Sequence, residues 1–540
     1  MARSQARAWI VALPVLLAAA MYARFFGGFW LGDDFGNLHR AWSDAQRGAL
    51  WSHAWAQFLA AVPSEGAFYR PVMLASLSLS EWLAGSRFAG WFAFNYAVHL
   101  ANTALVALLV ARLARACGRE GRVAGAVAAA FFALCPMLAE GVFWISARAD
   151  ASVTLLTLAG FYAWAGAPAT ALRALALPLL LAPALGFKES AAVFPLQMLV
   201  VILAWPARPT RAQVAAVGGC FGLVLLFFAI RAHLFGNVWH VYPAADNGSL
   251  PERLWHGAES IVPWWHALTR HDATLPVVYA TLSATALACL GLGARGGVRR
   301  VAAALLIGSM GLAAATLLNL GGMSGAGEGG RLTYTPVAWL ALALGVAAAR
   351  PLHGIGESAQ DPGGAYRRTG IALLACASMA GALVLDADLR AARLAERDMR
   401  ALAQALPPWS ATHPGLTLLI VPEREGAVVT ARNAQGALAL PPVQPEPLLH
   451  RVLPTLPGEI ALRHDQLSSG LATRLAELRP SQVDAAVLRQ LFERATPRWP
   501  DHYACWSPAR QVTEFSAPDP ADRARWIGAL RQASTQCGLE

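Results

Sequence analysis

A small set of charged and polar side chains interrupts an otherwise very hydrophobic chain, and all of them lie at or near the ends of apolar stretches. They are Asp33, Asp34, Arg70, His99, Arg148, Asp150, Lys188, Glu189, Glu328 and Arg331. A carboxylate can act as a general base when its pKa is raised by burial, and clustered cations stabilise negative charge that develops on a phosphate. If these ends meet on one side of a membrane, they predict one active site for an anionic substrate.

Two motifs near the N-terminus carry an acid pair and an arginine. Asp33 and Asp34 directly follow the first apolar stretch, and one of them can serve as a general base. The alternative is a solvated loop, or a helix cap ahead of the segment NLHRAW. Arg70, between Tyr69 and Pro71, has a planar guanidinium that can hold a phosphate, or it contacts lipid headgroups.

Polar residues then recur at helical spacing. Asn95, His99 and Asn102 follow one another at i, i+4 and i+7, so they share one face of a helix entering the bilayer. Side chains of this kind face a site or a watery cavity, or they join helices by hydrogen bonds. In the segment WISARAD, Arg148 and Asp150 enter an apolar run, and a structural ion pair between them is the alternative to a functional role.

Later motifs add two more cations. Lys188, followed by Glu189, is the only lysine in the chain, which indicates a position where a compact ammonium is needed and a guanidinium does not fit. Arg331 follows the glycine-rich segment GGMSGAGEGG and precedes Tyr334 in RLTYTP. A mobile loop over a cavity is one interpretation of that segment, and for Arg331 the alternative is contact with lipid headgroups. The sequence has no Walker A, GxSxG, HExxH or metal-spaced Cys/His motif.

The composition is that of an integral membrane protein. Of 540 residues, 56% are hydrophobic and 14% are charged, and the mean hydropathy is +0.43. The net charge of +10 comes from arginines in short connectors, which indicates membrane topology rather than nucleic-acid binding.

Arginine placement predicts the topology. About eleven spans alternate with arginine-rich inner and arginine-poor outer connectors. The expected spans are 8–28, 91–111, 123–138, 149–166, 171–186, 190–205, 212–231, 274–293, 301–319, 332–349 and 369–386. The segment 71–85 carries Glu81 and is predicted to be an interfacial helix, because counting it as a span would place a four-arginine connector outside. We interpret the N-terminus as an uncleaved span rather than a signal peptide.

These assignments predict an α-helical polytopic membrane domain over 1–388, with outer loops at 29–90 and 232–272. Residues 389–540 are expected to form a small soluble α/β domain on the outer side. In an oxidising compartment, Cys505 and Cys537 could pair there, or both could stay free.

Taken in order, the motifs resemble the polytopic GT-C glycosyltransferases, and within them the transmembrane-and-TPR O-mannosyltransferases and their bacterial relatives. The matching elements are DD at 33–34, YRP at 69–71, NYAVH at 95–99, WISARAD at 144–150, KE at 188–189 and RLTYTP at 331–336. The resemblance covers about residues 8–350. The long TPR array of that branch is absent, which leaves the acceptor undetermined.

The resemblance implies transfer of a sugar, hexosyl or mannosyl, from a polyprenyl-phosphate donor to a protein, lipid or glycan acceptor, with inversion at the anomeric carbon. By position, it gives the base role to Asp33 or Asp34, and donor phosphate binding to Arg70, Lys188, Arg331 and Tyr334. Supporting or acceptor contacts fall to Tyr69, Asn95, His99, Arg148, Asp150 and Glu189. It leaves a divalent metal open and implies a bacterial inner membrane protein with a cytoplasmic N-terminus and a periplasmic tail.

Two other membrane functions are alternatives for a sequence of this kind. A transporter or flippase of lipid-linked glycan needs charged residues at mid-membrane and on both sides, whereas the inner side here shows only topology arginines. An O-antigen-type ligase or polymerase uses a diphosphate-linked glycan and a site in a large outer loop, and the acidic pair in the first loop argues against it.

Overall fold

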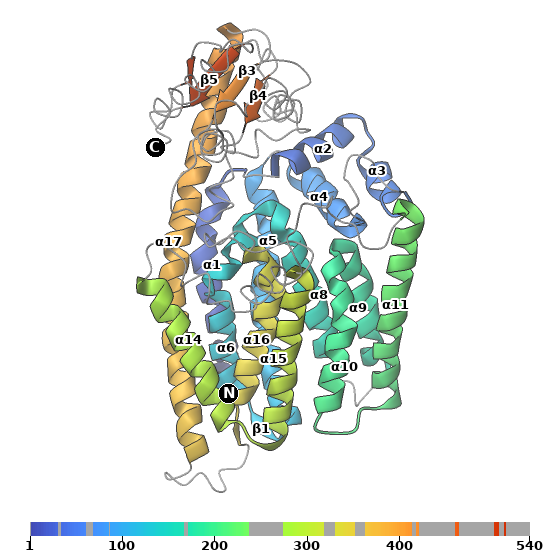
Figure 1. The fold of residues 1–540 in the computed structure, drawn as a ribbon, viewed down its shortest axis with the longest axis vertical. Helices are drawn as coiled ribbons and strands as arrows, with labels where there is room; N and C mark the ends of the chain where they lie inside the picture. Colours follow the sequence, from blue (N-terminus) through green and yellow to red (C-terminus); the bar gives the residue numbers. More distant parts are fainter. Residues whose placement is uncertain are drawn as a thin grey trace, which may run out of the picture.

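The computed structural model describes residues 2–30, 34–60, 69–85, 87–166, 171–236, 274–317, 330–351 and 362–412, together with four strands further along the chain. Asp33, Glu328, Cys537 and most of the outer loop at 232–272 lie outside the described residues. The described part is mostly helical, and its long helices run side by side along the long axis of the molecule (Figure 1).

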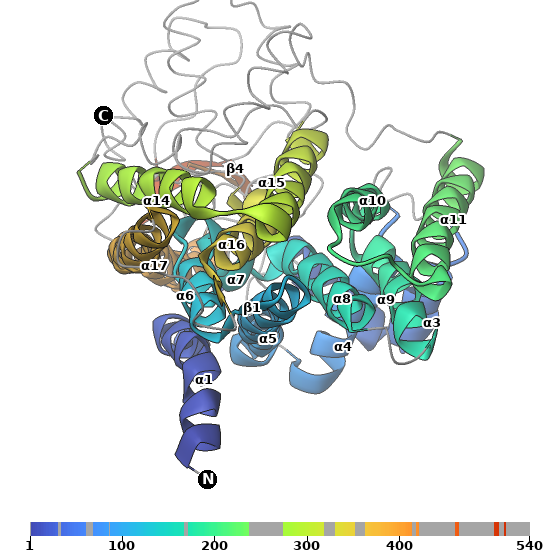
Figure 2. The same cartoon turned by 90° about the horizontal axis from the view of Figure 1, so that it is seen from below.

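The main helices coincide with the predicted spans. They are α1 (Ala2–Tyr22), α5 (Phe88–Ala116), α6 (Arg122–Ala133), α8 (Arg148–Ala165), α9 (Ala171–Phe187), α10 (Phe194–Ala204), α11 (Arg211–Phe235), α14 (Thr274–Gly293), α15 (Gly296–Leu317), α16 (Tyr334–Ala348) and α17 (Pro362–Thr412). Helices satisfy every backbone polar group internally, which hydrocarbon surroundings require. Figure 2 shows α9, α10 and α11 grouped beside the cluster of α5, α6 and α16.

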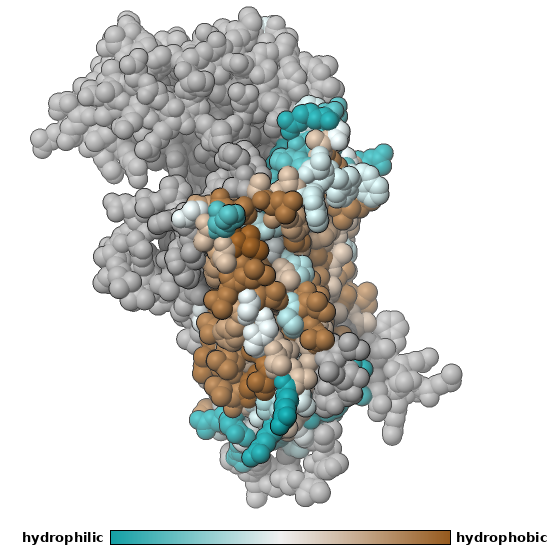
Figure 3. All heavy atoms as spheres, turned by 90° about the vertical axis from the view of Figure 1, so that its right-hand side faces the viewer, coloured by the Kyte–Doolittle hydropathy of each residue, from teal (hydrophilic) through white to brown (hydrophobic). Residues whose placement is uncertain are grey.

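Length and apolar composition single out fewer membrane crossings than the sequence predicts. Within the described residues, five helices are long and apolar enough to cross a membrane, or six if the bent pair Arg122–Ala133 and Pro136–Phe143 counts as one span. That pair bends by 56° at the break before Pro136, whose ring prevents helix continuation. The protein is therefore an integral multi-pass membrane protein, and the number of eleven crossings stays a prediction. Figure 3 shows an apolar belt on one face, between polar residues at either end.

Small residues let the central helices approach closely. A Cβ on Gly125 of α6 would lie 2.6 Å from the carbonyl oxygen of Ala107 in α5, and a Cβ on Gly345 of α16 would lie 2.5 Å from Val110. Helix interfaces in membranes depend on this kind of close packing, because lipid offers no hydrophobic drive for association. Glycines therefore allow α5, α6 and α16 to pack closely at the centre of the bundle.

Short helices lie across one end of the bundle. They are α2 (Asp34–Gln46), α3 (Leu50–Ala56) and α4 (Pro71–Ala84), and Figure 1 shows all three at the upper end. Pro71 opens α4 at a position where its missing N–H costs nothing, and Gly85, at φ 55°, ends it. The segment 71–85, which was predicted to be an interfacial helix, is therefore helical over Pro71–Ala84. With 14 residues, α4 is too short to cross a bilayer.

Connecting pieces complete the order of elements. The short helical turns are η1 (Ala23–Gly27), η3 (Pro136–Leu138), α7 (Ala139–Phe143), η4 (Ile145–Ala147), η6 (Glu189–Val193) and η7 (Gly330–Thr333). At the opposite end, β1 (Arg119–Glu120) pairs antiparallel with β2 (Arg350–Pro351) and ties two arginine-containing connectors together. This pairing agrees with the prediction that both connectors lie on one side.

The last helix runs past the predicted domain boundary. α17 has 51 residues and continues from its membrane segment, Gly363–Leu394, beyond residue 388 to Thr412. The strands β3 (Thr417–Ile420), β4 (Ile460–Arg463), β5 (His502–Trp506) and β6 (Val512–Glu514) then form a sheet in the order β4-β3-β5-β6. β3 is parallel to β4 and to β5, while β6 is antiparallel to β5. The rest of the chain after Thr412 lies outside the described residues, so the α/β assignment of this region stays a prediction.

Beyond its membrane segment, α17 carries a buried carboxyl group with an unusual pKa. Burial raises the pKa of Glu396 from its ordinary value of 4.5 to about 7, against the opposing effect of its ion pair with Arg393. A carboxyl group whose pKa is higher in the folded than in the unfolded state stabilises the fold most below its unfolded-state pKa. This contribution to stability is lost as pH rises to the folded-state pKa.

We predict that Glu396→Gln removes this pH dependence. Between about pH 4.5 and pH 7 the melting temperature of the wild type should fall relative to that of the variant, and the difference should level off above pH 7. Thermal unfolding of both purified proteins over pH 4 to 8 measures it. A difference in melting temperature that does not vary with pH would contradict the buried, protonatable state.

Candidate active site

The predicted site residues gather where the ends of α4, α8 and α9 meet the turns η4, η6 and η7. Arg70 stands directly before α4 and donates from Nε and Nη2 to Glu189 Oε2 and Oε1, at 2.9 and 2.6 Å. This two-point geometry matches a guanidinium to a carboxylate and fixes both side chains. It joins the first outer loop to the start of η6, 119 positions away in the sequence.

A second ion pair begins at the neighbouring residue. Lys188 follows the last residue of α9, and its Nζ lies 2.7 Å from both carboxylate oxygens of Asp150, in the first turn of α8. Both side chains are almost wholly buried, at 8% and 7% exposure. Because Lys188 and Glu189 are adjacent, the two ion pairs form a continuous charged chain from α4 to α8.

A third ion pair fixes the turn before α16. Arg331 Nη1 donates to Glu140 Oε1 at 2.7 Å, and the Arg331 backbone N–H donates to the other oxygen at 2.9 Å. The guanidinium also lies 4.6 Å from the ring centre of Trp144, in the range of a cation–π contact. Arg331 keeps 29% of its side chain exposed, whereas Glu140 is buried.

Asp34 begins α2 and is held by the turn η4. Its Oδ1 accepts bonds from the backbone N–H and from the hydroxyl of Ser146, at 2.8 and 2.6 Å. Asn37, one turn further along α2, donates to the same hydroxyl at 2.8 Å. The carboxyl group is 1% exposed. Asp34 therefore lies on the same end of the bundle as Arg148, two residues after Ser146.

Arg148 does not pair with Asp150, which excludes the structural ion pair that the sequence left open. It is fully buried and donates to Ser76 O at 3.0 Å, to Ser80 Oγ at 2.9 Å and to Trp91 O at 3.3 Å. Its guanidinium also lies 4.7 Å from the ring centre of Phe94. Arg148 thus holds α4 and α5 against the start of α8, a supporting role.

The polar face of α5 points into the helix bundle. His99 Nδ1 lies 2.7 Å from Tyr334 Oη, and Asn102 donates to the carbonyl of Ala151 at 2.9 Å and to Tyr334 at 3.4 Å. Asn95 donates to the carbonyl of Trp144 at 2.9 Å. All four residues are fully buried, so the interhelical hydrogen bonding that the sequence left open is present. Tyr334, His99 and Asn102 therefore join α5, α8 and α16 from inside the bundle, and the donor-binding role predicted for Tyr334 stays a prediction.

Tyr69 anchors the first outer loop. Its hydroxyl donates to the carbonyl of Phe58 at 3.0 Å, and its ring packs against Phe227 and Phe235 of α11, with centroids at 5.7 and 6.5 Å. The residue before Arg70 is thus fixed between the loop and α11, which limits the movement of the Arg70 backbone.

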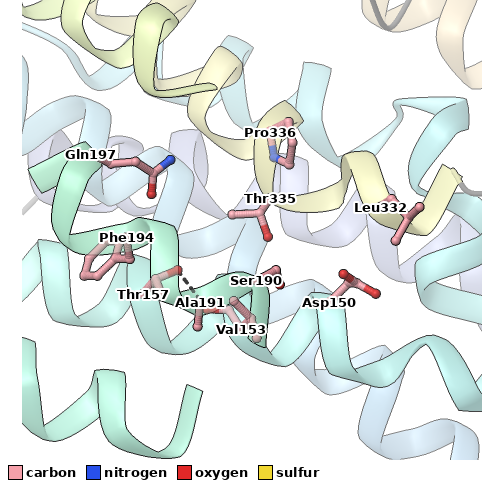
Figure 4. Close-up of a pocket in the computed structure, with 10 residues that line it drawn as sticks. All are labelled: Asp150, Val153, Thr157, Ser190, Ala191, Phe194, Gln197, Leu332, Thr335 and Pro336. Atoms are coloured by element: carbon pink, nitrogen blue, oxygen red, sulfur yellow. Dashed lines mark hydrogen bonds between the residues drawn. The ribbon is translucent and has the colours of Figure 1, made fainter. Parts of the chain in front are cut away.

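A narrow pocket adjoins the Lys188–Asp150 pair (Figure 4). Thr335 of α16 faces Ser190 of η6 across it, and Asp150 borders the pocket beside Leu332. Val153, Thr157, Ala191, Phe194, Gln197 and Pro336 complete the lining. The lining thus combines hydroxyl groups with apolar side chains next to the buried ion pair.

Possible metal ligands and cysteines are described for part of the chain only. No three His, Cys, Asp or Glu side chains come together there in a group that could hold a metal ion. The five cysteines whose state is described, at 117, 135, 220, 289 and 376, are free. Cys505 lies in β5, and its expected partner, Cys537, is outside the described residues.

Sequence reasoning did not assign roles to Glu140, Ser146 and Arg231. Glu140 binds Arg331 from 191 positions away, which no local spacing indicates. Ser146 lies inside the motif WISARAD, where only the charged residues were assigned roles. Arg231 is 1% exposed on α11, and an arginine at the outer end of a predicted span was the only available signal.

Comparisons with known proteins give two distant structural matches. The chain is similar to the arabinofuranosyltransferase AftD from Mycobacteria, at a TM-score of 0.43 and 18% identity, over 78% of this chain and 30% of that one. It is also similar to ArnT from Cupriavidus metallidurans bound to undecaprenyl phosphate, at a TM-score of 0.42 and 14% identity, over 93% of each chain. The chain spans less than a third of the length of the arabinofuranosyltransferase.

No protein-family model matches the sequence. No curated protein matches it either.

The buried Lys188–Asp150 pair yields a prediction about stability. Removing one member leaves the other as an uncompensated buried charge, which costs about 3 kcal/mol or more. We expect Lys188→Met to lower the free energy of unfolding by that amount, and Lys188→Met with Asp150→Asn to recover at least half of the loss.

Denaturation of the purified variants in detergent measures the difference. Arg173→Met, at an exposed position in the same helix, α9, is the control and should leave stability close to that of the wild type. A double variant that is less stable than Lys188→Met would contradict the assignment of a buried ion pair.

Proposed function

We propose that the protein is a membrane glycosyltransferase that moves a sugar from a polyprenyl-phosphate donor to a hydroxyl acceptor. The observation that carries this proposal is the arrangement at one end of the bundle. Arg70, Lys188 and Arg331 stand there, each paired with a carboxylate, and Asp34 lies at the same end beside Arg148. The apolar belt on the surface of the bundle faces the hydrocarbon region in which the polyprenyl chain of such a donor would lie.

The reaction needs a base and a leaving group. The acceptor oxygen attacks the anomeric carbon, and the bond from that carbon to the phosphate oxygen breaks. Its electron pair stays with the polyprenyl phosphate, and inversion follows from attack opposite the leaving group. The acceptor proton goes to a carboxylate of the first outer loop. We assign the base to Asp33 or Asp34, and the bonds from Ser146 hold the Asp34 carboxylate in place.

The cations stabilise the departing phosphate. Lys188 uses two of its three ammonium hydrogens on Asp150, and the third is available to a phosphate oxygen. Arg331 is the most exposed of the three cations and can rotate toward a ligand from the turn before α16. Such pairs hold the cations in position before the donor binds, which reduces the reorganisation that catalysis requires.

The acceptor class, the sugar and the compartment extend the proposal. We assign a hexosyl or mannosyl donor, a protein, lipid or glycan acceptor, and a bacterial inner membrane with the active site on the periplasmic side. The support for the compartment is that the arginine-containing connectors joined by β1 and β2 lie at the end of the bundle opposite α2, which begins at Asp34.

Asn substitutions test the base. We expect Asp33→Asn or Asp34→Asn to lower kcat for sugar transfer from a polyprenyl-phosphate donor by on the order of 10²- to 10⁴-fold, with donor KM within a few fold. Asp44→Asn, in the same helix as Asp34 but bound to His53 and Arg47, is the matched control. Wild-type turnover in both first-loop variants would remove the base assignment.

Cysteine labelling tests the orientation. In a background without native cysteines, a cysteine at exposed Trp55 and one at exposed Arg115 should react from opposite sides of the membrane. We expect Trp55→Cys to react with an impermeant reagent added to intact spheroplasts, and Arg115→Cys to react only after lysis. The reverse pattern would place the active site on the cytoplasmic side.

A further inference from the structure

The extension of α17 beyond its membrane segment contacts the chain just ahead of the acidic pair. The guanidinium Nη2 of Arg400 donates to the carbonyl oxygens of Gly27 and Gly28, at 3.1 and 2.8 Å. Its charge also lies 5.4 Å from the ring centre of Phe29. Gly28 precedes Asp33 and Asp34 by only a few residues, so these bonds fix the start of the segment that leads to them.

Glu396, one helical turn before Arg400 in α17, packs against the same segment of the chain at Gly28. Its side chain is 2% exposed, and its Oε1 lies 2.5 Å from where a Cβ on Gly28 would stand. Arg393 donates to its other oxygen at 2.7 Å and lies 5.8 Å from the ring centre of Phe25. Only glycine fits at position 28, because Phe88 and the Phe25 carbonyl also lie within 2.8 Å of that Cβ position.

The other side of the turn rests on the helix that supports the site. Trp30 is 2% exposed and packs edge-on against Phe88 and Trp91 of α5, each with centroids at 5.3 Å. The Trp91 carbonyl in turn accepts a bond from Arg148. The turn at 27–30 is thus held between α17 on one side and the Arg148-bearing part of the site on the other.

We propose that Arg400 and Glu396 are positioning residues that clamp the Gly27–Trp30 turn and so place the first-loop carboxylates for the transfer reaction. This inference rests on the proposed function for its catalytic consequence. Glu396 and Arg400 lie in α17, and the sheet follows α17 in the chain. The clamp therefore also connects that sheet to the active site. The donor-binding cations lie on other elements, so the clamp acts on the acceptor side of the reaction.

Arg400→Met tests the clamp in the full-length protein, with Arg397→Met as the matched control. Arg397 is exposed on the same stretch of helix and makes no hydrogen bond or ion pair with the described residues. We expect amide hydrogen exchange over residues 27–37 to be on the order of tenfold faster in Arg400→Met than in Arg397→Met, because a charge-assisted bond to two carbonyls is lost. Arg400→Lys should restore part of the protection, since an ammonium can donate to one carbonyl.

Transfer kinetics give the second readout. Arg400→Met should lower kcat on the order of tenfold while donor KM stays within about twofold, because the carboxylates are misplaced and the phosphate site is not. Unchanged hydrogen exchange in Arg400→Met would overturn the clamp, whatever the effect of the substitution on kcat. Faster exchange with unchanged kcat would confirm the contact and overturn its positioning role. If the wild type transfers no sugar, the proposed function fails, and the exchange experiment still decides whether the clamp exists.

Discussion

Charge pairing at the edge of a low-dielectric bundle is the constraint on which the rest of the structure depends. A lone ammonium or carboxylate there would be strongly disfavoured, so each cation of the site stands against a partner from a different element. Lys188 with Asp150 joins α9 to α8, and Arg70 with Glu189 joins α4 to η6. Because Lys188 and Glu189 are adjacent, displacing either pair moves the other, and the ends of three helices are fixed together.

Under the proposed function, the same pairing prepares the site for an anion. Arg70, Lys188 and Arg331 are each oriented by a carboxylate partner. A hydrogen-bonded scaffold lies beneath them. Arg148 binds neutral acceptors on α4 and α5, and His99, Asn102 and Tyr334 join helices that are far apart in the sequence. The buried polar network therefore supports the site, while the partly exposed side chains of Arg70, Glu189 and Arg331 are the groups that a ligand can reach.

The C-terminal helix gives the outer domain a physical connection to this site. α17 runs without interruption from its membrane segment to Thr412, and β3 begins at Thr417, so one continuous helix connects Glu396 and Arg400 to the start of the sheet. Both residues contact the turn that precedes the first-loop carboxylates.

The sequence by itself determined the membrane class, the positions of the long helices and the end at which the charged residues collect, because hydrophobic length and arginine placement are local properties. It also selected Arg70, Lys188, Glu189 and Arg331 by residue type. Only the tertiary structure decided which charges pair: Asp150 takes Lys188 rather than nearby Arg148, and Glu140 takes Arg331 across 191 positions. It also decided that His99 and Tyr334 are internal braces. Pairing depends on which helix ends meet in space, and that is set by packing among distant segments rather than by spacing along the chain.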